Sequence, residues 1–232
     1  MYRLIIIFLF SYSFSFGQIH EFGLFLGGAN AIADVGSEKY INPNTLAVGG
    51  IYKWNRSPRH SYRVSATYSN LRGADSKSNE SRRSIRDYSF KNEIKELTAG
   101  MEFTFWDFDL HNQHNYAVKT TPYLFTGLSY FNYKALALNS ANEIEDYDTH
   151  NSLAIPMIVG IKSAVTKHFI IGVEIGARYT FTDDLDGSNP VKEKKDIESL
   201  KFGNINSNDW YVFTGITLTY TFGRNPCFCN TN

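Results

Sequence analysis

Hydrophobic and polar residues alternate with a period of two along most of the chain. The segment WYVFTGITLTYTF near the end shows the pattern well: every second residue from Trp210 to Phe222 is apolar, apart from Thr214. The residues between them turn small and polar towards the end of the segment. Because successive side chains of a β-strand point to opposite faces, this pattern predicts a strand with one apolar face. No stretch of the chain shows a convincing helical period.

Eight segments of this kind are predicted to be strands. Most are about 10 to 15 residues long, whereas strands of soluble sheets usually have about 5–6. A tilted strand needs about 9–11 residues to cross a bilayer. Pro156, near the start of the sixth segment, is compatible only with a strand end or a bulge. The segments are residues 18–31, 45–54, 60–71, 94–106, 121–133, 153–165, 168–182 and 210–222.

The links between the predicted strands alternate in length. Those after the second, fourth and sixth strands are short or moderate, and those after the first, third, fifth and seventh are long and polar. Outer-membrane barrels show this asymmetry, with tight periplasmic turns and long extracellular loops. The sequence therefore predicts an all-β, eight-stranded antiparallel transmembrane barrel with both termini in the periplasm.

The two faces of the predicted strands carry different side chains. A soluble barrel of the lipocalin kind also alternates, but its charged face would point outwards. Charges enclosed in a narrow barrel can neutralise one another, and aromatic residues at strand ends are typical of membrane-interface girdles. This favours an apolar face towards lipid. The predicted lipid-facing girdle consists of Tyr52, Trp54, Phe103, Phe105, Phe169, Tyr179, Phe181, Trp210, Tyr220 and Phe222. The predicted lumen ion-pair network consists of Lys53, Arg63, Glu96, Glu102, Lys162, Glu174 and Arg178.

Within that network, Glu174 and Arg178 stand four residues apart on one face of the seventh predicted strand. Side chains at this spacing in a strand point to the same side. We therefore expect Glu174 and Arg178 to form an internal ion pair with each other.

The first residues, MYRLIIIFLFSYSFSFGQ, are typical of a secretory signal peptide. Arg3 gives a positive start, an apolar run follows, and Ser15 and Gly17 form a small-x-small cleavage site before Gln18. A buried hydrophobic strand is the alternative. The run is shorter than the roughly 20 residues of a membrane-spanning helix. The predicted division is a signal peptide at 1–17, a transmembrane barrel at 18–223 and a periplasmic tail at 224–232.

Composition narrows the classes of function. Lys and Arg total 23 and Asp and Glu total 23, so the formal net charge is zero and no nucleic-acid partner is expected. The only two cysteines, Cys227 and Cys229, are one residue apart, a spacing that suits neither an unstrained disulfide nor a zinc site. The sequence predicts no cofactor and no small-molecule substrate.

Two polar stretches contain residue types that bind metals. DFDLHNQHN lies in a predicted periplasmic turn, and TDDLDGSNPVKE partly matches a calcium loop, with Thr182 at the first ligand position. Ordinary turn chemistry is favoured for both, because neither spacing is specific. The acidic run EIEDYD and His150 form no traceable Ser/His/Asp set, so no enzyme is predicted. The candidate ligands are Asp107, Asp109, His111 and His114 in the first stretch and Asp184, Asp186, Gly187 and Glu193 in the second.

Six stretches follow one another over about residues 21–186: EFGLFLGGANAIADVG, YINPNTLAVGGIYKWNRSPRHSYRVSATYSNLRGAD, SFKNEIKELTAGMEF, TPYLFTGLSYFNY, IPMIVGIKSAV and VEIGARYTFTDDLDG. In this order they resemble the PorG family of the type IX secretion system of Bacteroidota. The stretch NRSPR is close to the family's pattern without matching it fully. TDDLDGSNP departs from the family's usual Thr-Asp-Tyr-Leu-Asp-Asp, which puts any loop role carried over from that motif in doubt.

The resemblance implies an integral outer-membrane barrel that supports protein export and, in some species, gliding motility. Its implied partners are a PorK-like lipoprotein and a PorN-like protein, which form a periplasmic ring. No catalytic residues are known for the family. The long polar loops leave open an alternative, a small surface-binding or adhesion barrel, and a rim enzyme that uses His150 and loop acids is a third hypothesis.

Overall fold

The computed structural model describes residues 19–108, 119–139, 141–190, 201–204 and 206–223. The predicted signal peptide and the predicted cysteine-bearing tail lie outside the described residues. So do Asp109, His111 and His114 of the first polar stretch and Glu193 of the second.

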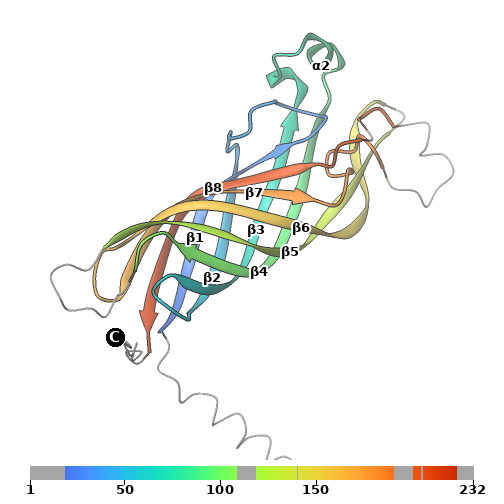
Figure 1. Ribbon diagram of the computed structural model, residues 1–232. Helices are drawn as coiled ribbons and strands as arrows, with labels where there is room; N and C mark the ends of the chain where they lie inside the picture. Colours follow the sequence, from blue (N-terminus) through green and yellow to red (C-terminus); the bar gives the residue numbers. More distant parts are fainter. Residues whose placement is uncertain (1–18, 109–118, 140, 191–200, 205, 224–232) are drawn as a thin grey trace, which may run out of the picture.

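Eight antiparallel strands, each hydrogen-bonded to the next, close into one barrel (Figure 1). Closure is made by the first and last strands, which pair from Ile32–Trp210 to His20–Phe222. The structure confirms the predicted eight-stranded antiparallel barrel. The strands are β1 (Ile19–Ile32), β2 (Thr45–Asn55), β3 (His60–Ala74), β4 (Ser89–Thr104), β5 (Thr120–Leu138), β6 (Ile144–Ala164), β7 (Phe169–Thr180) and β8 (Trp210–Phe222).

The two ends of the barrel differ. One, here called the turn end, carries the tight connections 56–59 and 165–168, the start of β1 and the end of β8. The β4–β5 connection also starts and ends there. The other end, here called the loop end, carries the β1–β2, β3–β4, β5–β6 and β7–β8 connections, including the 3-10 turn η1 (Asp75–Lys77) and the short helix α2 (Ser81–Arg86) (Figure 1). The sequence showed no helical period because α2 has only six residues. Neither described helix is long and apolar enough to cross a membrane.

The connection between β5 and β6 is shorter than predicted. The two strands continue to Leu138 and from Ile144, so the expected long loop is a turn of residues 139–143. The Asn139 side chain accepts the backbone N–H groups of Ala141 and Glu143 there. Most residues of β6 before Leu153 are exposed, so this part of the strand has no buried face and no alternating pattern to reveal it.

Pro156 lies inside β6, neither at its end nor at the register shift of the β5–β6 pairing, which lies at Ala135 and Leu136; this corrects the expectation. Its neighbour on β7 is Arg178. On the other side, the β5–β6 pairing runs from Thr126–Met157 directly to Ser129–Ala154 and omits Pro156. Because proline has no backbone N–H, a gap in one ladder lets it remain in a central strand.

The inner face of the barrel is not uniformly small and polar. Thr217, Thr219 and Thr221 of β8 are buried as the sequence predicted, but Tyr211 and Phe213 of the same strand are also buried and point inwards. Towards the loop end these two rings join an apolar core that includes Phe25 and Phe131. The interior therefore has an aromatic half near the loops and a charged half near the turns.

Glycines on the inner face make room for aromatic rings. Gly100 of β4 pairs with Gly127 of β5, and the edge of the Phe125 ring lies over them. A Cβ added at Gly100 would lie 2.8 Å from Gly127 Cα, 2.9 Å from Phe125 Cζ and closer still to the Thr126 carbonyl oxygen. The close approach of backbone and ring therefore requires glycine here.

We predict that Gly100→Ala lowers the free energy of unfolding of the barrel by about 1–3 kcal/mol, because backbone and ring must shift to accept the methyl group. Urea unfolding in lipid vesicles measures the change. Gly50→Ala is the matched control, since a Cβ at Gly50 meets nothing within 4 Å. Equal losses in the two variants would contradict the packing argument.

Candidate functional site

The outer surface of the barrel is a continuous apolar belt. Many of its side chains are strongly exposed; Leu24 on β1, for example, is 69% exposed. Among the described residues, the outward positions of the belt carry no Asp, Glu, Lys or Arg. Monomeric soluble proteins rarely expose an apolar surface of this extent. Members of the belt on all eight strands are Leu24, Leu26, Leu46, Val48, Val64, Leu97, Met101, Leu124, Leu128, Met157, Val159, Ile161, Ile171, Val173, Ile216 and Leu218.

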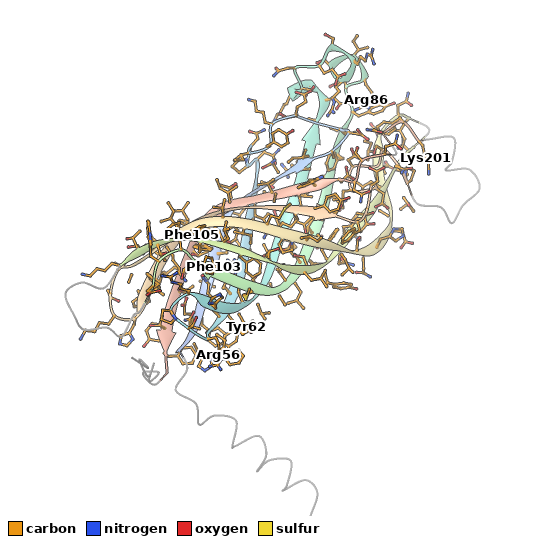
Figure 2. All side chains as sticks on the ribbon, in the orientation of Figure 1. Arg56, Tyr62, Arg86, Phe103, Phe105 and Lys201 are labelled. Carbon is orange, nitrogen blue, oxygen red and sulfur yellow. The ribbon has the colours of Figure 1, made fainter. Side chains whose placement is uncertain are left out.

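The predicted girdle residues fall into two rings, one at each end of this belt. At the turn end, aromatic side chains of neighbouring strands pack against one another; the centroids of the Phe169 and Tyr220 rings, for example, are 5.3 Å apart. At the loop end Tyr179 packs against Trp210 at 5.0 Å. Figure 2 shows Phe103 and Phe105 away from the end that carries Arg86 and Lys201. The turn-end girdle contains Tyr52, Trp54, Phe103, Phe105, Phe169, Tyr220 and Phe222, and the loop-end girdle contains Tyr179, Phe181 and Trp210.

The distance between the girdles suits the thickness of a hydrocarbon layer. Along β8, Trp210 and Phe222 are twelve residues apart, which is about 40 Å at roughly 3.3 Å per residue. A strand tilt of about 40° reduces this to a height of about 30 Å, against an apolar band of about 25 Å in outer-membrane barrels.

Sequence reasoning missed four aromatic members of these rings. Phe22 stacks on Phe222, and Tyr62 packs against Trp54 at the turn end. Tyr68 and Tyr130 are exposed at the loop end of the belt. Each of the four stands on the apolar face of its strand, which the alternation in the sequence shows. Their place near the edge of the belt depends on the cross-strand register, which the sequence does not give.

The charged half of the lumen is built around two carboxylates. The two carboxylate oxygens of Glu102 each form an ion pair with a lysine: Oε2 lies 2.7 Å from Lys53 Nζ, and Oε1 lies 2.7 Å from Lys162 Nζ. The Arg63 guanidinium donates two hydrogen bonds to the Glu174 carboxylate, at 2.7 and 2.8 Å. All five side chains are buried. They come from β2, β3, β4, β6 and β7, so the cluster joins strands across the barrel interior.

Arg178 and Glu96 form a second, separate pair. Arg178 Nε donates to Glu96 Oε2 at 3.2 Å, and the Tyr211 hydroxyl donates to the same oxygen at 2.6 Å. The predicted pair between Glu174 and Arg178 is therefore wrong. Both side chains point inwards, but they are four residues apart along β7. Residues of other strands lie closer to each of them across the barrel interior: Arg63 to Glu174, and Glu96 to Arg178.

Three polar partners of this interior were not predicted. Tyr123 donates its hydroxyl to Glu174 at 2.5 Å, and Tyr211 closes the second pair. Glu21 accepts hydrogen bonds from Asn55 and Thr219 at 2.7 and 2.9 Å. A tyrosine ring packs on an apolar face while its hydroxyl binds a polar partner. Alternation alone therefore does not tell whether a tyrosine faces the lumen or the outside.

The stretch that partly matches a calcium loop anchors the β7–β8 connection through its carboxylates. Asp186 accepts the backbone N–H groups of Val35 and Ser188 at 2.8 and 2.9 Å. Asp184 accepts the hydroxyls of Tyr133 and Thr182, each at 2.6 Å. Among the described residues, no three His, Cys, Asp or Glu side chains are arranged to hold a metal ion. The contacts with Thr182 and Ser188 are local turn contacts, whereas those with Val35 and Tyr133 join the connection to other parts of the barrel.

Like charges gather in this connection. Burial, together with the nearby carboxylates of Asp186, Asp34 and Asp184, raises the pKa of Asp183 to about 6. Burial and the neighbouring carboxylates of Asp186, Asp183 and Asp34 raise the pKa of Asp209, whose Oδ2 accepts the Leu185 N–H at 3.0 Å. His150 Nδ1 lies 3.5 Å from Asp184 Oδ2. The loop end therefore holds carboxyl groups that keep their protons above the usual pH range.

A family model described as "Domain of unknown function (DUF6089)" matches residues 1–231. The chain belongs to the DUF6089 family. A search of the curated proteins finds no match to its sequence.

Solved structures of outer-membrane proteins are similar to the DUF6089 chain in outline. Ail, the attachment invasion locus protein of Yersinia pestis, shares 10% identity with a TM-score of 0.46, over 89% of this chain and 99% of that one. Neisserial surface protein A shares 11% with a TM-score of 0.45, over 89% and 97%. A major outer membrane protein from Thermus thermophilus shares 9% with a TM-score of 0.49, over 88% and 99%.

We predict that Glu102→Gln lowers the free energy of unfolding of the DUF6089 chain by about 3–5 kcal/mol, because it leaves two buried lysines without a counter-charge. Glu93→Gln is the matched control: Glu93 also lies 2.7 Å from a lysine, but that pair is exposed to solvent, which screens it, so its loss should change stability far less. Urea unfolding in vesicles gives both values. Equal effects would show that the lumen pairs contribute no more than a surface pair.

We predict that the β7–β8 connection becomes less stable as pH rises from about 4 to 6. Below pH 3.8 Asp183 is protonated whether the connection is ordered or open, and between 3.8 and about 6 only the ordered form keeps the proton. Ordering then costs more as pH rises, up to about pH 6. Asp183→Asn should reduce this fall, read as the hydrogen-exchange protection of the Leu185 amide, whereas Asp146→Asn at an exposed site should not. An unchanged pH profile in Asp183→Asn would contradict the assignment.

Proposed function

We propose that this chain is an integral outer-membrane barrel, with the belt in the hydrocarbon and the two girdles at its interfaces. The uncharged belt between aromatic rings is the observation that carries this proposal. A hydrocarbon layer accepts apolar side chains and excludes unpaired charges, and closure of the barrel leaves no strand edge unpaired in lipid. The paired charges inside the barrel fit the same arrangement, because they avoid lipid altogether.

The asymmetry of the barrel supports an orientation. The turn end has two tight connections, and outer-membrane barrels place such turns in the periplasm. Because β1 begins and β8 ends at the turn end, both termini are then periplasmic, in line with a signal peptide at 1–17 and a tail at 224–232. The loop end with α2 faces the outside of the cell.

The proposed role is a non-enzymatic scaffold of the type IX secretion system. Bulky side chains and salt bridges occupy the barrel interior, which suits a support better than an open channel. The resemblance to the PorG family supports partners at the periplasmic side, a PorK-like lipoprotein and a PorN-like ring protein. Through them the barrel supports protein export and, where the organism glides, motility. It uses no cofactor and contacts outer-membrane lipid.

A site-specific crosslink tests the proposed role. A photo-reactive residue at Arg56, exposed in a turn-end connection, should crosslink to the ring lipoprotein or its partner in cells. The same residue at Arg82, exposed on α2 at the loop end, should not. The products are identified by mass spectrometry. Crosslinks from Arg82 alone, or a chain that stays monomeric at native levels, would contradict a ring anchor.

The alternative is a surface-binding or adhesion barrel. It is favoured by the β3–β4 arm, whose α2 helix holds Ile85 85% exposed to solvent. Replacing residues 75–88 by a two-residue turn separates the two functions. Normal secretion with lost binding to a surface would support the alternative, and lost secretion with an intact barrel would count against it.

A further inference from the structure

The connection between β1 and β2, residues 33–44, folds back along the outside of the barrel. The Asn30 side chain, on the outer face of β1, donates to the Tyr40 carbonyl at 3.2 Å and accepts the Asn42 N–H at 3.1 Å. Pro43 packs on Gly28, where an added Cβ would lie 2.5 Å from the proline ring. Val212 of β8 points outwards yet is only 3% exposed. The connection therefore covers the seam between β1 and β8.

Beside this covered seam lies a groove of about 730 Å³ on the outer wall. Its floor is one row across three strands, in which Met157 pairs with Ala177 and Ala177 pairs with Val212. The small side chain of Ala177 leaves the row hollow at its centre. Tyr40 and Ile41, 75% and 54% exposed, form the facing side of the groove.

The polar lining of the groove lies at its loop end. The row directly above the floor pairs Tyr179 with Trp210, two members of the loop-end girdle. Above that row the groove is lined by Asp34, Asp209 and neighbouring polar residues. Arg83 is also there, but its guanidinium is held by the carbonyls of Ala33 and Gly36. The remaining rim residues are Asn204, Ser207 and Asn208.

We infer that this groove holds an acyl chain of a lipid from the outer leaflet, with a hydroxyl-bearing head at the rim. The apolar floor is continuous with the belt, so the groove opens towards the proposed hydrocarbon layer and a lipid chain is the ligand that can reach it. At the rim, the Asp34 carboxylate and the amide oxygens of Asn204 and Asn208 can accept hydrogen bonds, which matches a head rich in O–H donors. The inference rests on the proposed outer-membrane placement.

Native mass spectrometry of the full chain, extracted from outer membranes in a detergent without a sugar head, tests the inference. Wild-type protein should carry one lipid of the native membrane. Ala177→Phe fills the floor and should lower the lipid-bound fraction about tenfold. The matched control is Ala99→Phe, at an exposed belt position on β4 outside the groove, which should retain the lipid. Heat-modifiable migration in gels checks that each variant is a folded barrel.

The outcomes separate this inference from the proposed function. Wild-type protein without a bound lipid, or equal lipid retention in both folded variants, overturns the groove while leaving the membrane placement intact. A lipid lost equally from both variants also overturns it, since the lipid would then be general annular lipid. A wild-type chain that does not fractionate with the outer membrane overturns the proposed function itself.

Discussion

The structure depends on the ion pairs that the barrel encloses. Glu102 forms ion pairs with two lysines from opposite parts of the wall, and Glu174 accepts two hydrogen bonds from Arg63. Ionised groups removed from water are tolerated only when paired and hydrogen-bonded. Each pair also connects strands that are not neighbours, so the same contacts fix the positions of several strands at once.

This interior explains the outer surface. Because the charged side chains of the strands are gathered inside, each strand can present an uncharged face outwards between the girdles. The two halves of the lumen are filled differently. The Glu102 and Glu174 ion pairs lie near the turns, whereas rings such as Phe131 and Tyr211 lie near the loops, around the Arg178–Glu96 pair. A barrel packed in this way is a rigid support, and its connections remain free to vary.

Strand positions could be predicted where one face is apolar and the other polar. The last strand was predicted with its observed bounds, Trp210–Phe222, because alternation there covers the whole strand. Where both faces meet water, as in β6 before Leu153, the pattern disappears and the sequence indicated a loop. The partner of Arg178 could not be predicted either, because it depends on cross-strand register and barrel curvature, which no local spacing contains.

Asn30 shows how a polar residue in an apolar row marks a surface covered by protein. It stands on the outer face of β1, where an amide towards lipid would leave its hydrogen bonds unmade. Both ends of the amide instead bind the returning β1–β2 connection. The sequence records this as a break in the apolar row, after Leu24 and Leu26. Breaks of this kind show where a barrel wall meets its own loops and where it meets the membrane.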